Sequence, residues 1–363
     1  MKTNSIFKLL LLSSIVFTSC TKEETITETI TQNIFETINS DIIVSSEGNF
    51  GAKDGSVSYF GKNNTDVFYY ENENGAKAAG LIQSICFGEE DAYIILNDVS
   101  QIIVVDKNTF KKKAIVQTGL GNPRYMTIVG DKGYITNWGS GSDETDDYIA
   151  VLDLTTNTIE ETTIPLANGV ERVVTKNNKL YVSHQGGFSS NNIVSVVDLG
   201  AGNSITTVTV KDNPDELFFN NAGELVVLSQ GKPLTYGGAP DYPALTNTTS
   251  SISFINIADN TINKELVFTE NTRATLMSYD NGNIYYYVGD KVFMINDNST
   301  EISTSKGISV GSIYGMSTKQ NYLFTVSYSF TSLCKFNIVN VSTLETEYSS
   351  AVGLGASKVY FIE

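Results

Sequence analysis

The sequence predicts an all-β fold: a seven-bladed β-propeller of four-stranded antiparallel blades, with the ring closed by the C-terminal strand in the first blade. Short runs of Val, Ile, Thr and Tyr, separated by Asn, Asp and Gly, are typical of β-strands and hairpin turns. These runs recur at steps of about 46 residues across residues 41–363, a spacing typical of propeller blades. The first repeat lacks its first strand, and a matching segment ends the chain.

Composition and charge exclude several classes of function. Acidic residues outnumber basic ones by 40 to 24, and the resulting net charge of −16 argues against a nucleic-acid partner. The single histidine, His184, excludes metal sites that need two imidazoles. The spacing of the three cysteines indicates neither a disulfide scaffold nor a metal site, and we expect no bound metal and no cofactor.

Residues 1–19 have the pattern of a lipoprotein signal peptide. Lys2 and Lys8 precede an apolar stretch, Leu9–Phe17, that is too short to span a bilayer. Small residues then lead into Cys20, as lipoprotein processing requires, because the thiol of that cysteine receives the diacylglycerol. We therefore expect Cys20 to be lipidated and to become the first mature residue. An ordinary secretory signal with an incidental cysteine is the alternative.

Residues 20–40 are expected to form a flexible tether that carries the lipid. They are rich in Thr, Glu, Ile and Asn and contain no hairpin signal. The segment Thr21-Lys22-Glu23-Glu24 resembles the lysine and acidic signal that sends Bacteroidetes lipoproteins to the outer face of the outer membrane. This resemblance implies an outer-membrane protein that faces the cell exterior, held to the membrane by the lipid on Cys20.

One repeat shows the four strands of a blade in order. Residues 122–128 and 133–137 are predicted as the first two strands, and residues 149–159 contain the third strand, a turn and the fourth. The third strand of a repeat ends in Asp or Asn before a polar turn. These strand ends are Val105-Asp106, Leu152-Asp153, Val197-Asp198, Ile255-Asn256, Ile295-Asn296 and Val339-Asn340. An earlier copy at residues 55–61 brings the count of repeats to seven.

The two ends of the chain predict how the ring closes. Residues 41–48 align with the second strand of a repeat, as in residues 180–186, and no first strand precedes them. Residues 353–362 align instead with a first strand, residues 119–128. The C-terminal strand would then be innermost in the first blade, which leaves no unpaired edge between the first and last blades. Two packed sheets could hold as many strands, but they would not explain why the strand missing from the first repeat reappears at the C-terminal end.

Each predicted inner strand begins with a polar side chain near the channel mouth. Alignment on Arg124 places one such residue in every blade: Gln83, Arg124, Glu171, Asp215, Arg273, Tyr314 and Lys358. Propellers usually bind ligands at this end of the blades, so we treat these residues as candidate ligand contacts. The alternative is that the cations and carboxylates neutralise one another around a wet channel.

The loops between second and third strands are predicted on the same face and carry aromatic side chains. These are Phe50, Trp138, Phe188, Tyr236, Tyr242, Tyr328 and Phe330. Apolar rings in such loops indicate a contact surface, and we include them among the candidate ligand contacts. The longest insertion, residues 230–250, is expected to form a semi-rigid aromatic flap. Packing of that loop on its own blade, and capping of a blade edge by Trp138, are the alternatives.

The remaining candidates lack a catalytic context. His184 has no serine and carboxylate arranged as in a nucleophile elbow, so a structural or ligand-contacting role is favoured. The acidic run Asp143–Asp147 lacks the alternating spacing and the glycine of a calcium loop. We expect that run to be a solvated loop.

Several motifs together resemble a known family. The segments Glu47–Gly51, Asn122–Tyr125 and Tyr134–Trp138, with the Val-x-Val-x-Asp-type third strands, are similar to the YncE-like bacterial propellers. They resemble in particular the BtuG-type cobalamin-binding surface lipoproteins of Bacteroidetes. The resemblance covers most of residues 41–363 and implies a corrinoid ligand and a TonB-dependent outer-membrane receptor as partner. The fifth to seventh blades depart most from the repeat, with Asn in place of the strand-end Asp.

Three functions remain open from the sequence. The first, which we favour, is a binding protein that captures a corrinoid and passes it to the transporter, because mixed polar and aromatic loops suit the amide rim and apolar ring of a corrinoid. The second is a lactonase-like hydrolase in which Glu171 and Asp215 help to hold a divalent metal. The third is an adhesion or assembly scaffold that needs the face but no pocket.

Overall fold

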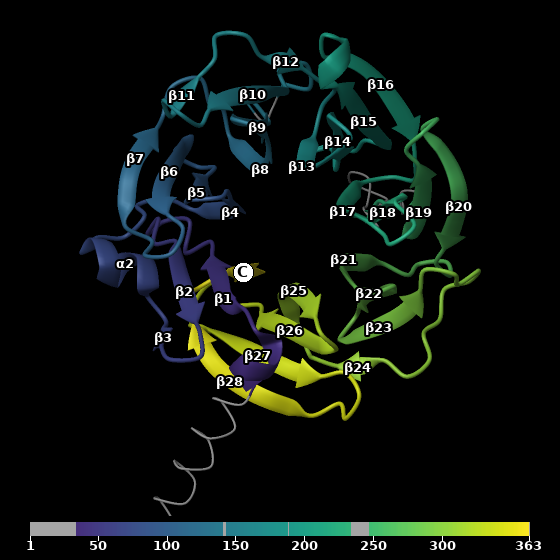
Figure 1. Ribbon diagram of the computed structural model, residues 1–363. Coiled ribbons are helices and arrows are strands. Elements are labelled where there is room, and N and C mark those ends of the chain that lie inside the picture. The colour runs from purple at the N-terminus through teal and green to yellow at the C-terminus, as the bar shows by residue number, and fades with distance from the viewer. Residues whose placement is uncertain (1–33, 141–142, 188, 234–246, 363) are drawn as a thin grey trace, which may run out of the picture.

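The computed structural model describes residues 34–362 except 141–142, 188 and 234–246. The strands of the described residues form seven antiparallel sheets arranged in a ring (Figure 1). Each sheet is one propeller blade, so the predicted all-β, seven-bladed fold is confirmed. We number the blades from the one that contains β1.

Within each blade the strands pair in order from the inner strand to the outer edge. The first blade contains β29 (Ala356–Ile362), β1 (Asp41–Ser46), β2 (Ser56–Phe60) and β3 (Thr65–Asp66), and the second contains β4 (Ile82–Phe87), β5 (Asp91–Leu96), β6 (Gln101–Asp106) and β7 (Lys112–Val116). The third contains β8 (Pro123–Val129), β9 (Lys132–Asn137), β10 (Tyr148–Asp153), β11 (Thr158–Ile159) and β12 (Ile164–Pro165), and the fourth contains β13 (Val170–Lys176), β14 (Lys179–His184), β15 (Ile193–Asp198) and β16 (Ser204–Thr209).

The last three blades follow the same plan. They contain β17 (Pro214–Phe219), β18 (Leu225–Ser229), β19 (Ser251–Asn256) and β20 (Thr261–Val267), then β21 (Ala274–Asp280), β22 (Asn283–Val288), β23 (Lys291–Asn296) and β24 (Ile308–Ser309), and finally β25 (Ile313–Lys319), β26 (Tyr322–Ser327), β27 (Cys334–Asn340) and β28 (Thr346–Val352). The third blade departs from the plan because β11 and β12 both pair with β10, which divides its outer edge between two short strands.

The second strand of a blade is buried on both faces, because each blade packs between two neighbours. Residues 92–96 of β5 are all buried, and so are all residues of β18. These strands therefore form nearly continuous apolar runs in the sequence rather than alternating patterns. Apolar clusters fill the spaces between blades; one of them joins Leu228 of the fifth blade to Ile284 of the sixth.

The C-terminal strand closes the ring as the sequence predicts. β29 pairs antiparallel with β1 as the inner strand of the first blade, with Val359 opposite Val44 and Tyr360 opposite Ile43. Backbone groups extend this pairing beyond the strands, since the Glu47 amide donates to the Gly355 carbonyl at 2.9 Å. The first and last segments of the propeller thus hydrogen-bond directly, and neither leaves an unpaired edge between the first and last blades.

The folded body begins earlier than the expected boundary at residue 41. Residues 34–38 form a helical turn whose Ile34, Phe35 and Ile38 side chains are buried in the apolar cluster between the first and last blades. The Phe35 ring packs edge-on against Tyr348, with 5.1 Å between ring centroids. Residues 34–38 therefore belong to the propeller and not to a tether, because burying three large apolar side chains stabilises their attachment.

Helices are short in the described part of the chain. Besides the turn at residues 34–38, it contains α2 (Tyr69–Asn74) and the 3-10 helix η1 (Leu199–Ala201). None of the helices formed by the described residues is long and apolar enough to cross a membrane.

Deletion of residues 356–363 should destabilise the entire ring. The deletion removes the strand that pairs with β1 and exposes apolar surface that Ala356 and Val359 cover. We expect the truncated chain to aggregate or to melt many degrees below the intact protein, as measured by thermal unfolding with circular dichroism. Equal melting temperatures for the two chains would show that this pairing does not hold the ring closed.

Candidate functional site

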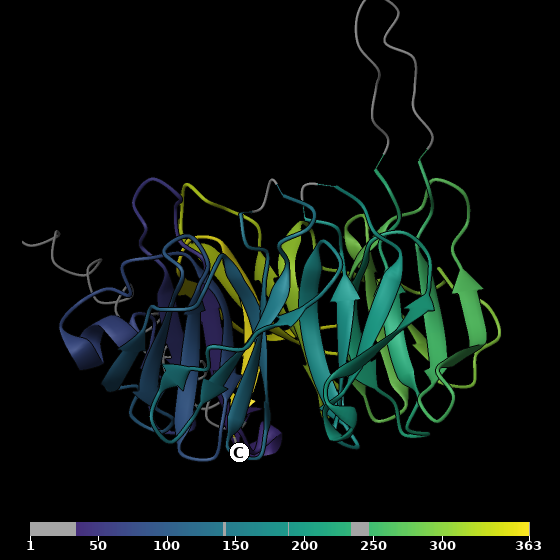
Figure 2. The same ribbon diagram turned by 90° about the horizontal axis from the view of Figure 1, so that it is seen from above.

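Two sets of loops lie on one side of the ring, which we call the upper face. They are the loops between the second and third strands of each blade and the loops from each outer strand to the next inner strand. Figure 2 shows this side at the top and the C-terminal end of the chain on the opposite, lower face. The helical turn at residues 34–38 also lies at the lower face.

Every inner strand carries the same irregularity close to the upper face. Three residue steps along the inner strand match two steps along its partner, as between Pro123 and Met126 opposite Asn137 and Ile135. The same two-against-three register occurs in all seven blades. Such a β-bulge changes the direction in which side chains point, and bulges are common next to binding sites.

The register corrects the predicted polar ring at two of its seven positions. Pairing places the following residues at equivalent positions, second in each inner strand: Gln83, Arg124, Glu171, Asp215, Thr275, Tyr314 and Ser357. Arg273 lies before β21 begins, and Lys358 is one residue further along β29. Their charge makes both residues resemble Arg124 in sequence, but the strand register places a hydroxyl side chain at each equivalent position.

Arg124 and Glu171 form a buried ion pair between the third and fourth blades. The Arg124 Nε and Nη2 atoms donate to the two carboxylate oxygens of Glu171, each at 3.0 Å. The Gln83 amide donates to Glu171 at 3.5 Å, and the Arg124 guanidinium lies 3.8 Å from the centre of the Trp138 ring. In this part of the ring a cation and a carboxylate therefore neutralise one another, as in the alternative to ligand contact. Trp138 supports the arginine and donates from its indole nitrogen to the Val170 carbonyl.

A second ion-pair network involves Arg172 and Glu216, two residues outside the predicted polar ring. The Arg172 Nε donates to Asp215 at 2.8 Å, and its Nη2 donates to Glu216 at 2.7 Å. Gln230 donates to the other oxygen of Asp215 at 2.8 Å. Burial raises the pKa of Glu216 to about 7, although the adjacent Arg172 opposes that rise. Their position in the sequence could have identified these two residues, because Arg172 and Glu216 directly follow ring residues Glu171 and Asp215.

The two remaining cations of the predicted ring have no carboxylate within ion-pair distance among the described residues. Lys358 donates to the Ser357 hydroxyl at 3.3 Å, and burial lowers the pKa of its ammonium group. The Nε of Arg273 is buried without a hydrogen-bond partner in the described part of the chain. Burial likewise lowers the pKa of Arg273.

Aromatic side chains gather on the upper face where the last blade meets the first. The rings of Tyr314, Tyr328 and Phe330 pack edge-to-face in all three pairs, with centroids 5.4 to 5.6 Å apart. The Asn49 side chain donates to the Phe330 carbonyl at 3.3 Å, which brings the loop that carries Phe50 beside them. Phe50 is 75% exposed and Tyr328 is 56% exposed. We call these four aromatic residues the aromatic patch.

His184 is buried inside the fourth blade and does not reach the upper surface. Its Nδ1 lies 3.1 Å from the Asn168 carbonyl oxygen and its Nε2 lies 2.8 Å from the Ser195 hydroxyl. Burial lowers its pKa to about 4, because the charged imidazolium would be poorly solvated there. The geometry favours the structural role for His184 over contact with a ligand.

The acidic run at residues 143–147 is only partly solvated. Asp143 is exposed, as expected, but Asp147 is buried and accepts hydrogen bonds from the amides of Gly169 and Val170 at 2.6 and 3.0 Å. Asp147 therefore fixes the loop that leads into β13. Within the residues that the structure describes, no group of three or more His, Cys, Asp or Glu side chains is placed to hold a metal ion.

Three predicted contacts, Phe188, Tyr236 and Tyr242, lie outside the described residues, as does the lipidation site Cys20. The structure brings together Gln83, Arg124 and Glu171, and separately Tyr314 with Tyr328. It does not bring His184 to the same surface.

Comparisons with known proteins agree on the fold. Residues 41–213 match the family model of a domain of unknown function (DUF5074). No curated protein matches the sequence. A putative 6-phosphogluconolactonase from Bacteroides fragilis superposes with a TM-score of 0.62 at 11% identity, covering 89% of this chain and 98% of the other.

Two further solved structures are similar. Hydrazine synthase of Kuenenia stuttgartiensis has a TM-score of 0.57 at 14% identity, covering 77% of this chain and 92% of the other. The dihydro-heme d1 dehydrogenase NirN has a TM-score of 0.52 at 14% identity, with 89% and 75% covered. At such identities, these similarities show a shared fold alone.

Acid should destabilise the protein through His184. The unfolded histidine has a pKa near 6.5, whereas the folded value is about 4, so between these values the unfolded chain binds a proton that the folded chain does not. The free energy of unfolding should therefore fall as the pH decreases from about 6.5 to 4, by up to about 3 kcal/mol. Urea unfolding across this range measures the loss.

His184→Gln is the matched control, because glutamine keeps a donor and an acceptor but does not titrate. The variant should lack this part of the pH dependence, while the carboxylates contribute equally to both proteins. Identical pH profiles for the two would contradict the assignment of His184 as a buried neutral residue.

Proposed function

We propose that this chain is a lipid-anchored binding protein that captures a corrinoid on its upper face and passes it to a TonB-dependent outer-membrane transporter. The observation that carries the proposal is the aromatic patch. Phe50 and Tyr328 expose most of their surface at the seam between the last and first blades. Exposed aromatic groups of this kind mark contact surfaces, because leaving them in water forfeits the free energy of burial.

The chemistry of the patch suits a large ligand with an apolar plane and polar edges. Aromatic rings supply broad, rigid contact area at low conformational cost. Polar groups lie close by: the Tyr314 hydroxyl donates to the Glu47 carboxylate at 3.3 Å. A corrinoid presents an apolar ring bordered by amides, so its ring would cover the patch while its amides meet these polar groups.

The place where residues 34–38 join the propeller supports an orientation in which the upper face points away from the membrane. Residues 34–38 pack on the lower face, beside the C-terminal end. Glu36 in this turn pairs with Lys62 at 2.8 Å, which adds a polar contact to the buried apolar ones. A lipid on Cys20 would therefore pull from the lower side of the ring and leave the aromatic patch facing away from the membrane.

Calorimetry with cyanocobalamin tests the ligand. The wild-type protein should bind it, and Phe50→Ala and Tyr328→Ala should each weaken binding by roughly 1 to 3 kcal/mol, the usual range for an aromatic anchor. Leu344→Ala is the matched control, because Leu344 is 58% exposed but lies in the turn between β27 and β28, on the face opposite the upper-face loops. Absence of heat and of any melting shift with the wild-type protein would reject the corrinoid.

The surface location has its own test. Cys20→Ser should release the protein from the membrane fraction, because the serine hydroxyl does not receive the lipid. Protease treatment of intact cells should cleave the wild-type protein if it faces the exterior. Full protection of the wild-type protein in cells that remain intact would contradict surface display, and a Cys20→Ser protein that stays with the membranes would contradict anchoring by Cys20.

A further inference from the structure

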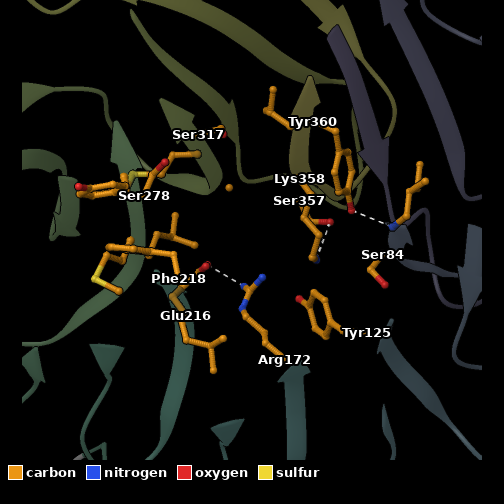
Figure 3. A pocket seen from close by; sticks show the side chains of 18 of the residues that line it. Ser84, Tyr125, Arg172, Glu216, Phe218, Ser278, Ser317, Ser357, Lys358 and Tyr360 are labelled. Carbon is orange, nitrogen blue, oxygen red and sulfur yellow. Dashed lines mark hydrogen bonds and ion pairs between the residues drawn. The ribbon is translucent and has the colours of Figure 1, made fainter. Parts of the chain in front are cut away.

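A cavity lies in the channel below the polar ring. Its volume is about 370 Å³, and it is lined by residues from the inner strands. Figure 3 shows Tyr125, Arg172 and Lys358 pointing toward a common space, with Glu216, Ser317 and Tyr360 around it. This volume is more than ten times the roughly 30 Å³ that one water occupies in the liquid, and it lies in the range of small-molecule sites.

Among the described residues that line the cavity, Lys358 is a cation without an ion-pair partner. Its ammonium group donates to the Ser357 hydroxyl at 3.3 Å and lies 5.5 Å from the centre of the Tyr125 ring. No carboxylate of the described residues lies within 4 Å of it. An ammonium group removed from bulk water costs several kcal/mol unless it is paired, and one hydroxyl and an aromatic face compensate only part of that cost.

Two hydroxyl groups that line the cavity are further donors available to a ligand. The Tyr125 hydroxyl makes no hydrogen bond with the described residues, and neither does the Ser317 hydroxyl. The Arg172 guanidinium lies 4.6 Å from the centre of the same Tyr125 ring, so the two cations flank one aromatic side chain. Tyr125, Ser317 and Lys358 are half-buried, and hydrogen-bond donors that converge on one cavity suit a ligand that accepts hydrogen bonds.

We infer that this cavity binds a small organic monocarboxylate, whose oxygens accept hydrogen bonds from Lys358 and Tyr125. The apolar part of the molecule would lie against Phe218, Leu276 and Met316, which line the same cavity. This site is separate from the aromatic patch, and the inference does not depend on the proposed corrinoid function.

The charges around the cavity favour a monoanion. Arg172 is bound by two carboxylates, Asp215 and Glu216, at 2.8 and 2.7 Å, while Lys358 adds one further positive charge. Among the described residues that line the cavity, Lys358 is therefore the cation with no carboxylate within 4 Å. One negative charge pairs with the Lys358 ammonium group, whereas a dianion such as hydrogen phosphate would bring a second negative charge with no cation left to pair with it.

Benzoate is the probe for this site, with benzamide as its neutral equivalent. The full-length protein should bind benzoate in calorimetric titrations and melt at a higher temperature in its presence, while benzamide should bind at least about tenfold more weakly because a charge-assisted hydrogen bond is lost. Inorganic phosphate at pH 8 should also bind at least about tenfold more weakly than benzoate, because a dianion exceeds the available positive charge.

Variants of Lys358 locate the bound anion. Lys358→Met removes the ammonium and keeps an unbranched side chain, so it should weaken benzoate binding at least about tenfold and melt no lower than the wild type in buffer alone. Lys358→Arg should retain binding. Lys335→Met changes an exposed lysine on β27 and should leave benzoate affinity unchanged.

Three results would overturn the inference. They are no response of the wild-type protein to benzoate, equal affinity for benzoate and benzamide, and unchanged benzoate affinity in a folded Lys358→Met variant. A fall in melting temperature of Lys358→Met together with unchanged binding would show that Lys358 is structural. Cyanocobalamin binding measured on the same variants separates this site from the aromatic patch, because Lys358→Met should not change the affinity of the upper face.

Discussion

The pairing of β29 with β1 is the contact on which both candidate sites depend. It supplies the seventh inner strand, and with it Ser357 and Lys358 enter the channel. The loop that leads into β29 also forms the base of the aromatic patch: a Cβ at Gly355 would lie 2.4 Å from the Phe330 ring. Without closure of the ring, neither the cavity nor the patch could be complete, because each is built from both ends of the chain.

The bulge shared by the inner strands explains why the channel is so polar. In a regular strand, neighbouring side chains point to opposite faces, so only one of two consecutive residues could face the channel. With the extra residue of the bulge, both Glu171 and Arg172 take part in ion pairs with inner strands of neighbouring blades. Asp215 and Glu216 do the same from β17. Local backbone geometry therefore doubles the number of charged groups that the fourth and fifth blades contribute.

Much of the fold follows from the sequence because it depends on repetition. The blade count, the strand order and the closure by residues 356–362 can all be predicted from recurring strand ends and from one displaced strand. The attachment of residues 34–38 could not be predicted, since three apolar side chains in a single helical turn give too short a pattern. Their burial depends on a surface formed by strands far away in the sequence.

The site was less predictable because strand register decides which side chains meet. Arg124, Glu171 and Asp215 were selected correctly as members of one ring. Arg273 and Lys358 were matched to that ring by charge, although pairing assigns Thr275 and Ser357 to the equivalent positions. The amino-acid sequence alone does not reveal a shift of one or two residues in strand register. For Lys358, a shift of one residue moves the cation from the rim of the channel into the cavity.

The two halves of the channel differ in a way that determines where a ligand could bind. Inner strands of the third, fourth and fifth blades hold carboxylates and guanidinium groups that pair with one another across blade boundaries. At the equivalent positions, the sixth, seventh and first blades contribute the hydroxyl groups of Thr275, Tyr314 and Ser357. Ion pairs between blades fix the charged side chains of the third to fifth blades, and most of their hydrogen-bonding groups are already paired. Lys358 belongs to the second half, where no carboxylate of the described residues competes for it within 4 Å, so an anion from solution meets the least competition there.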